Sequence, residues 1–294
     1  MSGLNRTTAP PSWEEQVKTQ VRRRYDRMAA EDTFRPGAAE RAALAGYPQN
    51  KLNTLPPGVA DTYSGCGYGL AGVDLAGVNI AIDLGCGAGL DTLLLAQDLP
   101  DDAKVIAIDL SPKMLQRVGE GAEFIKGAAI SLLASDIECL PLNNNIADLV
   151  IANASLNLTI YKEVAFEEIF RILRPGGRLV ARDLVRFADL DVELAQDPGA
   201  WNTSLGGVML ESKLVDAAMQ AGFDQLNISE HIPFGPVTAV RLEAIKTKEI
   251  SLHWRSSATW KISVKGKPRA LSVSLRESSE IFSLFGKTEI TSFI

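Results

Sequence analysis

Between residues 78 and 185 the chain alternates short apolar runs with segments whose apolar residues recur at helical spacing. The runs VNIAIDL (78–84) and AKVIAIDL (103–110) predict buried strands, and GLDTLLLAQDL (89–99) predicts a helix. Further strands are expected at 130–137, from 147 onward and at 176–185, with helices at 111–118, 161–173 and 210–223. This alternation indicates an α/β fold built on a Rossmann-like, doubly wound, mostly parallel sheet.

The flanking segments have different patterns. Residues 13–30 place apolar side chains on one helical face, and Ser12 followed by Glu15 fits a capping box at its start. We therefore expect three parts: an N-terminal tail, lid helix and cap loop (1–77), a core (78–247) with an acceptor-side insert at about 186–222, and a small β-rich C-terminal extension (248–294).

Composition narrows the possible partners. The net charge of −6 over 294 residues disfavours a nucleic-acid or anionic-membrane binder, which would present a basic face. No leader-like apolar region and no run of eighteen apolar residues occurs, so we expect no membrane partner. Three cysteines do not make a disulfide framework, which favours a reduced, cytoplasmic compartment.

The stretch AIDLGCGAGLD (81–91) carries three glycines in five residues after the first strand. Its spacing is G-x-G-x-G, because residue 90 is Leu, and so it departs from the dinucleotide fingerprint. Asp83 stands where a carboxylate would repel a pyrophosphate but suit an ammonium group. Asp109, at the end of the second strand, can accept both hydroxyls of a ribose. A ligand with a ribose, an amino group and no phosphate fits S-adenosylmethionine.

Four segments extend this interpretation, in the order AIDLGCGAGLD, AIDLSPKML, SDIECLPL and RILRPGGRLV. Together they resemble the motifs of class I S-adenosylmethionine-dependent methyltransferases. The resemblance implies S-adenosyl-L-methionine as cofactor and S-adenosyl-L-homocysteine as product. It places at the cofactor Asp83, Gly85, Cys86, Gly87, Gly89, Asp109, Leu110, Met114, Asp136, Ile137 and Asn153.

The resemblance also implies a role for each group of residues. The glycine loop and Asp83 shape the pocket for the methionine end, with Cys86 as a small filler. Asp109 binds the ribose, and Leu110 and Met114 pack near the adenine. Asp136 and Ile137 meet the adenine edge, and Asn153 lies beside the methionine part.

Segments outside these motifs, among them SGCGYG, ADLVIANASLNLT and DPGAWNTSLGG, resemble the arsenite methyltransferase family over about 13–247. That family holds trivalent arsenic with cysteine thiolates, soft ligands for a soft element. Cys66 occupies one expected cysteine position, but Ala154 and Ser204 occupy the other two. A lone thiolate cannot make a three-sulfur site, so we expect a small organic acceptor in place of arsenite.

The acceptor itself and the oligomeric state cannot be derived from the sequence, and neither a catalytic residue nor a metal site is assigned. Methyl transfer needs in-line positioning and exclusion of water more than it needs a particular side chain. Two alternatives stay open: a metalloid methyltransferase that works with fewer cysteines, and a non-catalytic S-adenosylmethionine-binding protein. The acceptor-side candidates are Tyr25, Tyr63, Cys66, Ser155, Asn157, Trp201, Asn202 and Ser204.

Overall fold

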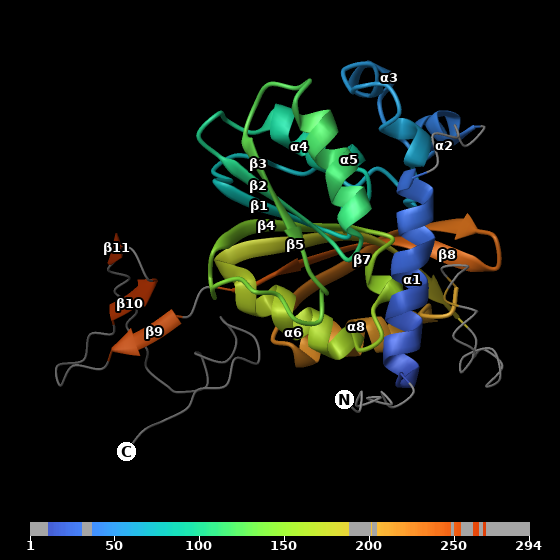
Figure 1. Cartoon of the computed structure of the whole chain (residues 1–294). Helices are drawn as coiled ribbons and strands as arrows, with labels where there is room; N and C mark the ends of the chain where they lie inside the picture. The colour runs from blue at the N-terminus through green and yellow to red at the C-terminus, as the bar shows by residue number, and fades with distance from the viewer. Residues whose placement is uncertain are drawn as a thin grey trace, which may run out of the picture. The chain divides into compact units, whose positions relative to one another are not determined.

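The computed structural model describes residues 11–30, 37–187, 201, 205–247, 250–253, 261–264 and 267–268. The chain divides into two compact units, Met1–Thr247 and Lys248–Ile294. In the first unit, a twisted sheet is covered by helices on both faces (Figure 1). None of the helices among the described residues is both long and apolar enough to cross a membrane.

The sheet of the first unit has, within the described residues, eight strands in the order β3-β2-β1-β4-β5-β8-β7, with β6 paired to β5. The pairs from β3 to β5 are parallel, and β8 and β7 are antiparallel additions at one side. The strands are β1 (Ile80–Leu84), β2 (Lys104–Asp109), β3 (Ala129–Ala134), β4 (Ala147–Asn153), β5 (Leu173–Arg186), β6 (Met209–Leu210), β7 (Gln225–Phe234) and β8 (Val237–Ile245). The direction of winding reverses between β1 and β4, and open sheets of this kind bind ligands at the carboxyl ends of the strands at such a point.

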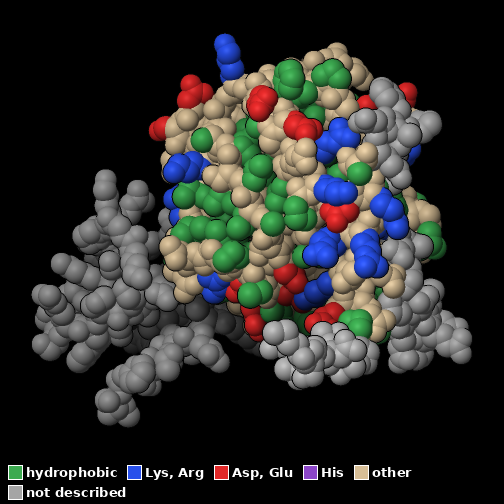
Figure 2. Space-filling view, viewed as in Figure 1, with side chains coloured by type: hydrophobic (Ala, Val, Ile, Leu, Met, Phe, Trp, Pro, Cys, Tyr) green, Lys and Arg blue, Asp and Glu red, His purple; other side chains and the backbone are tan. Residues whose placement is uncertain are grey.

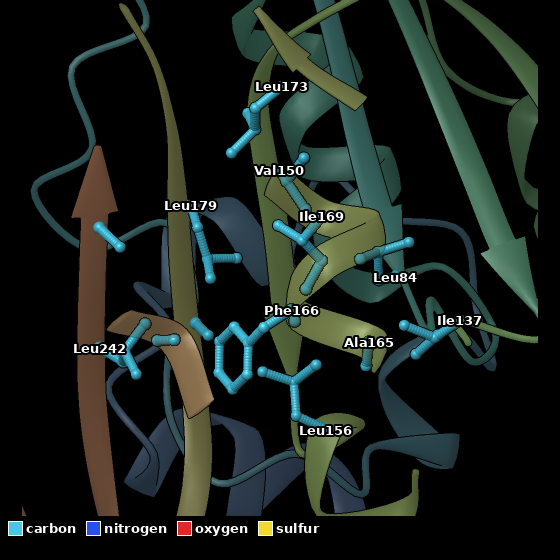
Figure 3. Close-up of a cluster of buried hydrophobic side chains, with 14 of the residues drawn as sticks. Leu84, Ile137, Val150, Leu156, Ala165, Phe166, Ile169, Leu173, Leu179 and Leu242 are labelled. Atoms are coloured by element: carbon cyan, nitrogen blue, oxygen red, sulfur yellow. The ribbon is translucent and has the colours of Figure 1, made fainter. Parts of the chain in front are cut away.

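Helices α4 (Leu90–Asp98) and α5 (Pro112–Ala122) cover one face, and α6 (Lys162–Ile172) and α8 (Glu211–Gln220) cover the other (Figure 1). Phe166 and Ile169 of α6 point into a cluster of buried side chains from β1, β4, β5 and β8 (Figure 3). This packing fixes the strand ends that carry the candidate site.

The N-terminal part contributes α1 (Trp13–Ala30), α2 (Ala38–Leu44), α3 (Gln49–Leu52) and the short η1 (Ala60–Thr62). The expected capping box begins α1: the backbone N–H of Ser12 donates to Glu15 Oε2 (2.8 Å), and the N–H of Glu15 donates to Ser12 Oγ (3.2 Å). Helix α1 crosses the end of the sheet and packs on α5 (Figure 1).

The elements agree with the sequence prediction except at some of their ends. The third strand was expected to reach residue 137, but β3 ends at Ala134, where Ser135 donates to the Asp109 carbonyl and the chain turns. The fifth strand was expected to begin at Gly176, but β5 begins at Leu173. The register between β4 and β5 shifts there, which lets three more residues precede the regular ladder.

The second unit contains an antiparallel sheet made of β9 (Ile250–His253), β10 (Lys261–Val264) and β11 (Lys267–Pro268) within its described residues. Ile250 pairs with Val264, and Lys267 also pairs with Val264 on the other side. The sequence predicted short strands in this part of the chain.

Candidate functional site

The main cavity lies at the carboxyl ends of β1, β2 and β4 and measures about 740 Å³ including its open mouth. A second cavity of about 400 Å³ shares Ser64, Gly85, Gly87 and Asn153 with it, so the two form one continuous site. The main cavity is lined by Lys18, Val21, Arg22, Tyr25, Ser64, Gly85, Gly87, Asp109, Leu110, Ser111, Ser135, Asp136, Ile137, Glu138, Asn153, Ala154, Ser155, Leu158 and Thr159.

The glycine loop forms the floor where the two cavities meet. Gly85 has φ +71°, and a Cβ there would lie 2.3 Å from the Cβ of Ser155, so no other residue fits without movement of the backbone. Gly87 also has positive φ, and its N–H donates to Asp109 Oδ2 (2.9 Å). Gly89 forms the left-handed N-cap of α4. Cys86 packs on Ala107 and also lines the second cavity.

Two buried carboxylates line the second cavity. Asp83 accepts from the Thr92 hydroxyl (2.5 Å). Asp91 accepts from the Tyr47 hydroxyl through Oδ1 (2.8 Å) and from the Asn153 amide through Oδ2 (2.8 Å). Only 2% of Asp83 and 6% of Asp91 is exposed to solvent. We call the group Tyr47, Asp83, Asp91, Thr92 and Asn153 the acidic cage.

The acidic cage holds two carboxyl groups whose ionised forms are disfavoured by burial. Burial, together with the neighbouring charge of Asp91, raises the pKa of Asp83 to about 8. Burial raises the pKa of Asp91 to about 6, although the bonds from Asn153 and Tyr47 and a weaker attraction from Arg182 oppose this shift. No lysine or arginine of the described residues forms an ion pair with either carboxylate. Because buried charges need a partner, the cage suits a bound cation.

Asp109 ends β2 beside the glycine loop. Its Oδ1 accepts from the N–H of Ser111 (2.8 Å), while its Oδ2 accepts the bond from Gly87 described above. Each carboxylate oxygen has a further lone pair, so Asp109 can still accept hydroxyl groups from the cavity that it lines. Burial raises the pKa of Asp109 to about 6.

The far end of the main cavity is closed by an ion-pair cluster. Lys18 of α1 places its Nζ 2.6 Å from Asp136 Oδ2 and 2.6 Å from Glu138 Oε2. Glu138 in turn accepts from the backbone N–H of Ile160 (2.6 Å) through its other oxygen. Ile137 is buried and lines the cavity between the two acidic residues. Asp136 and Ile137, the residues expected at the adenine edge, both line the main cavity, and Lys18 ties α1 to Asp136.

Further contacts hold α1 over the site. The Ser111 hydroxyl donates to Asp26 Oδ1 (2.6 Å), and Arg117 Nε donates to the Ala29 carbonyl (2.9 Å). Met114 packs on the buried Met28 and does not line either cavity, whereas Leu110 does. Lys and Arg side chains gather on the outer surface over α1 (Figure 2).

The acceptor-side candidates fall into two groups. Tyr25 and Ser155 line the main cavity and Tyr63 lines the second, with the Ser155 hydroxyl donating to the Leu84 carbonyl (2.7 Å). Among the described residues that do not line either cavity are three buried candidates: Cys66, Asn157 and Trp201. Asn202 and Ser204 lie outside the described residues.

Cys66 lies in an apolar cluster with Ala154, Leu184 and Val208. Burial raises the pKa of its thiol, and the nearby charge of Asp183 adds to this, so the group is protonated at neutral pH. Trp201 is buried against Val17 and Val21 of α1. Among the described residues, no group of three His, Cys, Asp or Glu side chains could hold a metal ion.

Residues 77–231, more than half of the chain, match the family model of a methyltransferase domain. The chain belongs to the methyltransferase domain family. The resemblance to S-adenosylmethionine-dependent methyltransferases, drawn from the four motifs, is confirmed, as is the expected fold class.

Relatives of this methyltransferase domain include the arsenite methyltransferase of Halobacterium salinarum, 30% identical over 184 residues, which cover 63% of this chain and 47% of that protein. The chain spans about half the length of the curated arsenite methyltransferases that it matches. The crystal structure of CrArsM, an arsenic(III) S-adenosylmethionine methyltransferase from Chlamydomonas reinhardtii, superposes with a TM-score of 0.57 at 20% identity, over 80% of this chain and 89% of that chain. The 4+2 cyclase SpnF superposes with a TM-score of 0.52 at 18% identity, over 82% and 98%.

Several residues of the candidate site escaped the sequence analysis. Asp91 lay at the end of the quoted glycine motif, and its place in the first turn of the next helix was the signal that could have found it. Lys18 and Glu138 come together only through the crossing of α1. Tyr47 belongs to the cap segment, where no periodic pattern indicates which side chain turns inward.

Proposed function

We propose that this chain transfers a methyl group from S-adenosylmethionine to a small organic acceptor by in-line displacement. The acidic cage carries the proposal. It offers two buried carboxylates, with no ion-pair partner among the described residues, beside a glycine loop that leaves room for a ligand against its backbone. A ligand with an ammonium group and a ribose, and no phosphate, fits this cage together with Asp109.

The residues that would hold the cofactor follow from the contacts described above. Asp83 and Asp91 would bind its ammonium group, Asp109 its ribose hydroxyls, and Asp136 with Ile137 its adenine edge. When bound, the cofactor supplies an electrophilic methyl group on a sulfonium. Helix α1 would exclude water from the cavity, and the glycine loop and Asn153 would orient the cofactor for transfer.

An organic acceptor is favoured by the surroundings of Cys66. The Cys66 thiol is protonated, and residue 154 beside it is an alanine with no sulfur. A site with three thiolates therefore lacks an ionised ligand at position 66 and any ligand at position 154. The cavity wall near Asn153 offers backbone, hydroxyl and apolar groups from Ser64, Ala154 and Leu158. We also propose a cytoplasmic setting without nucleic acid or membrane, on the grounds of net charge and the three free cysteines.

The proposal is tested first by calorimetry with S-adenosylhomocysteine. The wild type should bind it, and the double variant Asp83→Asn, Asp91→Asn should bind it at least about tenfold more weakly, since the cation loses its counter-charge. A panel of small amines, phenols and carboxylic acids should then give S-adenosylhomocysteine in a turnover assay. Absence of binding by the wild type would refute the proposal.

The metalloid alternative rests on the named arsenite methyltransferase relative and on the contact between Cys66 and Ala154. The double variant Ala154→Cys, Ser204→Cys should gain arsenite affinity if the pocket has only lost its ligands, because thiolates supply that affinity. Efficient arsenite methylation by the wild type would overturn the organic acceptor.

The fold of SpnF shows that a methyltransferase-like architecture does not by itself fix the reaction. A chain that binds S-adenosylhomocysteine yet turns over no acceptor on the panel would support the non-catalytic alternative.

A further inference from the structure

Asn153, at the carboxyl end of β4, joins two parts of the site. Its Nδ2 group donates to Asp91 Oδ2 (2.8 Å) in the acidic cage and to the Gly67 carbonyl (2.8 Å) in the cap segment. Its Oδ1 accepts from the backbone N–H of Cys66 (3.0 Å). One amide side chain therefore fastens the loop of residues 63–67, which we call the acceptor loop, to the cage.

The acceptor loop lies directly on this amide. A Cβ at Gly65 would be 2.7 Å from Asn153 Oδ1 and 2.8 Å from the ring of Tyr63, so the loop can approach only because residue 65 is glycine. Ser64 of the same loop lines both cavities. The position of the loop therefore shapes the wall at which the cofactor and acceptor ends of the site meet.

Tyr47 makes a second link to the cage. Its hydroxyl donates to Asp91 Oδ1 (2.8 Å) and accepts from Asn153 Nδ2 (3.1 Å), and its ring packs on Tyr63 at 5.3 Å between centroids. Asp91 thus accepts from both Tyr47 and Asn153, and the two N–H groups of Asn153 are shared among Asp91, Gly67 and, at the longest distance, Tyr47. The acceptor loop is attached to this group through Asn153 and through the ring of Tyr63.

We propose that Asn153 and Tyr47 are positioning residues that couple occupation of the acidic cage by an ammonium group to ordering of the acceptor loop. The inference rests on the proposed function, because the cofactor is the source of that ammonium group. A cation bound between Asp83 and Asp91 holds the Asp91 carboxylate in the place where it accepts from Tyr47 and Asn153, and hydrogen bonds to an ionised acceptor are strong. Both bonds that Asp91 accepts are then reinforced, and with them the two anchors of the loop.

An order of binding follows from this coupling. The cofactor binds first and orders the acceptor loop, and the acceptor then binds against the ordered loop. The demethylated product keeps the same ammonium group, so the loop stays ordered until that product leaves.

The test is amide hydrogen exchange of the full chain, because the Cys66 N–H donates to Asn153 and reports the link directly. Exchange of the segment 63–67 is measured for the free protein, with saturating S-adenosylhomocysteine, and with saturating 5′-methylthioadenosine, which has the nucleoside but no amino acid part. We expect S-adenosylhomocysteine to slow exchange by about tenfold, which corresponds to about 1.4 kcal/mol, and the nucleoside to leave it within about twofold of the free protein.

Variants separate coupling from simple packing. Tyr47→Phe keeps the ring stack and removes one anchor, so the protection given by S-adenosylhomocysteine should fall by half or more on a logarithmic scale. Asn153→Ala should abolish it. Asn79→Ala serves as the control, since Asn79 also donates through its side-chain amide, to the Gly77 carbonyl (3.3 Å) away from the cavities, and this variant should behave as the wild type.

Equal protection by both ligands, or full protection in Tyr47→Phe and Asn153→Ala with S-adenosylhomocysteine bound, would overturn the coupling while leaving the proposed function in place. Failure of the wild type to bind S-adenosylhomocysteine in calorimetry would overturn the proposed function and the coupling with it.

Discussion

Three carboxylates of the site share a raised pKa, but their surroundings prepare them for different partners. Asp109 already accepts two backbone N–H groups, which favour its ionised form and partly offset burial. Asp83 accepts from one hydroxyl and faces the charge of Asp91, so its pKa rises furthest. We infer that Asp109 is prepared for neutral hydroxyls and the Asp83–Asp91 pair for a cation.

Replacing Asp109 by Ala should weaken binding of S-adenosylhomocysteine by about 1–3 kcal/mol, because the ribose hydroxyls lose a charged acceptor. Calorimetry measures the change, and Asp74→Ala, in the loop before β1, is the control. Unchanged affinity in Asp109→Ala would show that Asp109 does not bind the ribose.

The affinity for the cofactor should depend on pH through Asp83. In the free protein this group has a pKa of about 8 and holds a proton at neutral pH, whereas a bound ammonium group favours the ionised form. Affinity for S-adenosylhomocysteine should therefore rise by up to about tenfold per pH unit between pH 6 and 7.5. In Asp83→Asn only the smaller rise in affinity near pH 6, due to Asp91 and Asp109, should remain. If the affinity of the wild type depends on pH no more than that of the variant, Asp83 does not bind the ammonium group.

Asp83 should also make the stability of the free protein depend on pH, but with the opposite sign: affinity rises with pH, and stability falls. Its pKa is raised above the usual 3.8, so between pH 4 and 8 the folded chain binds more protons at Asp83 than the unfolded chain does. The contribution of Asp83 to the free energy of unfolding therefore falls as the pH rises through this range. Thermal unfolding with and without S-adenosylhomocysteine should show the stabilisation by ligand growing with pH, and growing less in Asp83→Asn.

At the scale of elements, α1 is held by contacts with residues far along the chain. Its polar anchors are the clamp from Lys18 to Asp136 and Glu138 and the bond between Ser111 and Asp26. Its apolar face buries Val17 and Val21 against Trp201, and Met28 against Met114. The helix is thus a wall of the cavity and also a cover for apolar side chains of the core.

Deleting residues 1–30 should lower the affinity for S-adenosylhomocysteine by about tenfold or more, because the adenosine end of the cavity loses its cover. Lys18→Met is the milder test, since it keeps the helix and removes only the clamp, and a loss of about twofold to tenfold is expected by calorimetry. A deletion variant with full affinity would refute the role of α1 as a lid.

The elements around the cofactor end were predictable because local patterns carry them. Runs of apolar residues predict the buried strands. A serine followed by a proline is typical of the start of a helix, and Ser111 does cap α5 by accepting from the N–H of Met114 (3.2 Å). The start of β5 was wrong by three residues because its register shift with β4 depends on the partner strand. The acidic cage was only half predicted, since Tyr47 and Asp91 are 44 positions apart in the sequence and the cap segment around Tyr47 carries no periodic signal.

At the scale of the whole molecule, the chain divides into two compact units after Thr247. All residues that line the two cavities belong to the first unit. We therefore expect a chain ending at Thr247 to bind S-adenosylhomocysteine with unchanged affinity. Calorimetry on this truncated chain tests the division, and a loss of more than about fivefold, or about 1 kcal/mol, would mean that the second unit contributes to the site.

The crossing of α1 has a consequence for synthesis of the chain. Helix α1 leaves the ribosome before the partners of its apolar face, α5 at residues 112–122 and Trp201. At about 5–20 residues per second, the interval from Ala30 to Trp201 is on the order of ten seconds or more. During this time Val17 and Val21 form an uncovered stripe on the nascent chain. That stripe is a natural binding site for a chaperone that recognises short amphipathic segments.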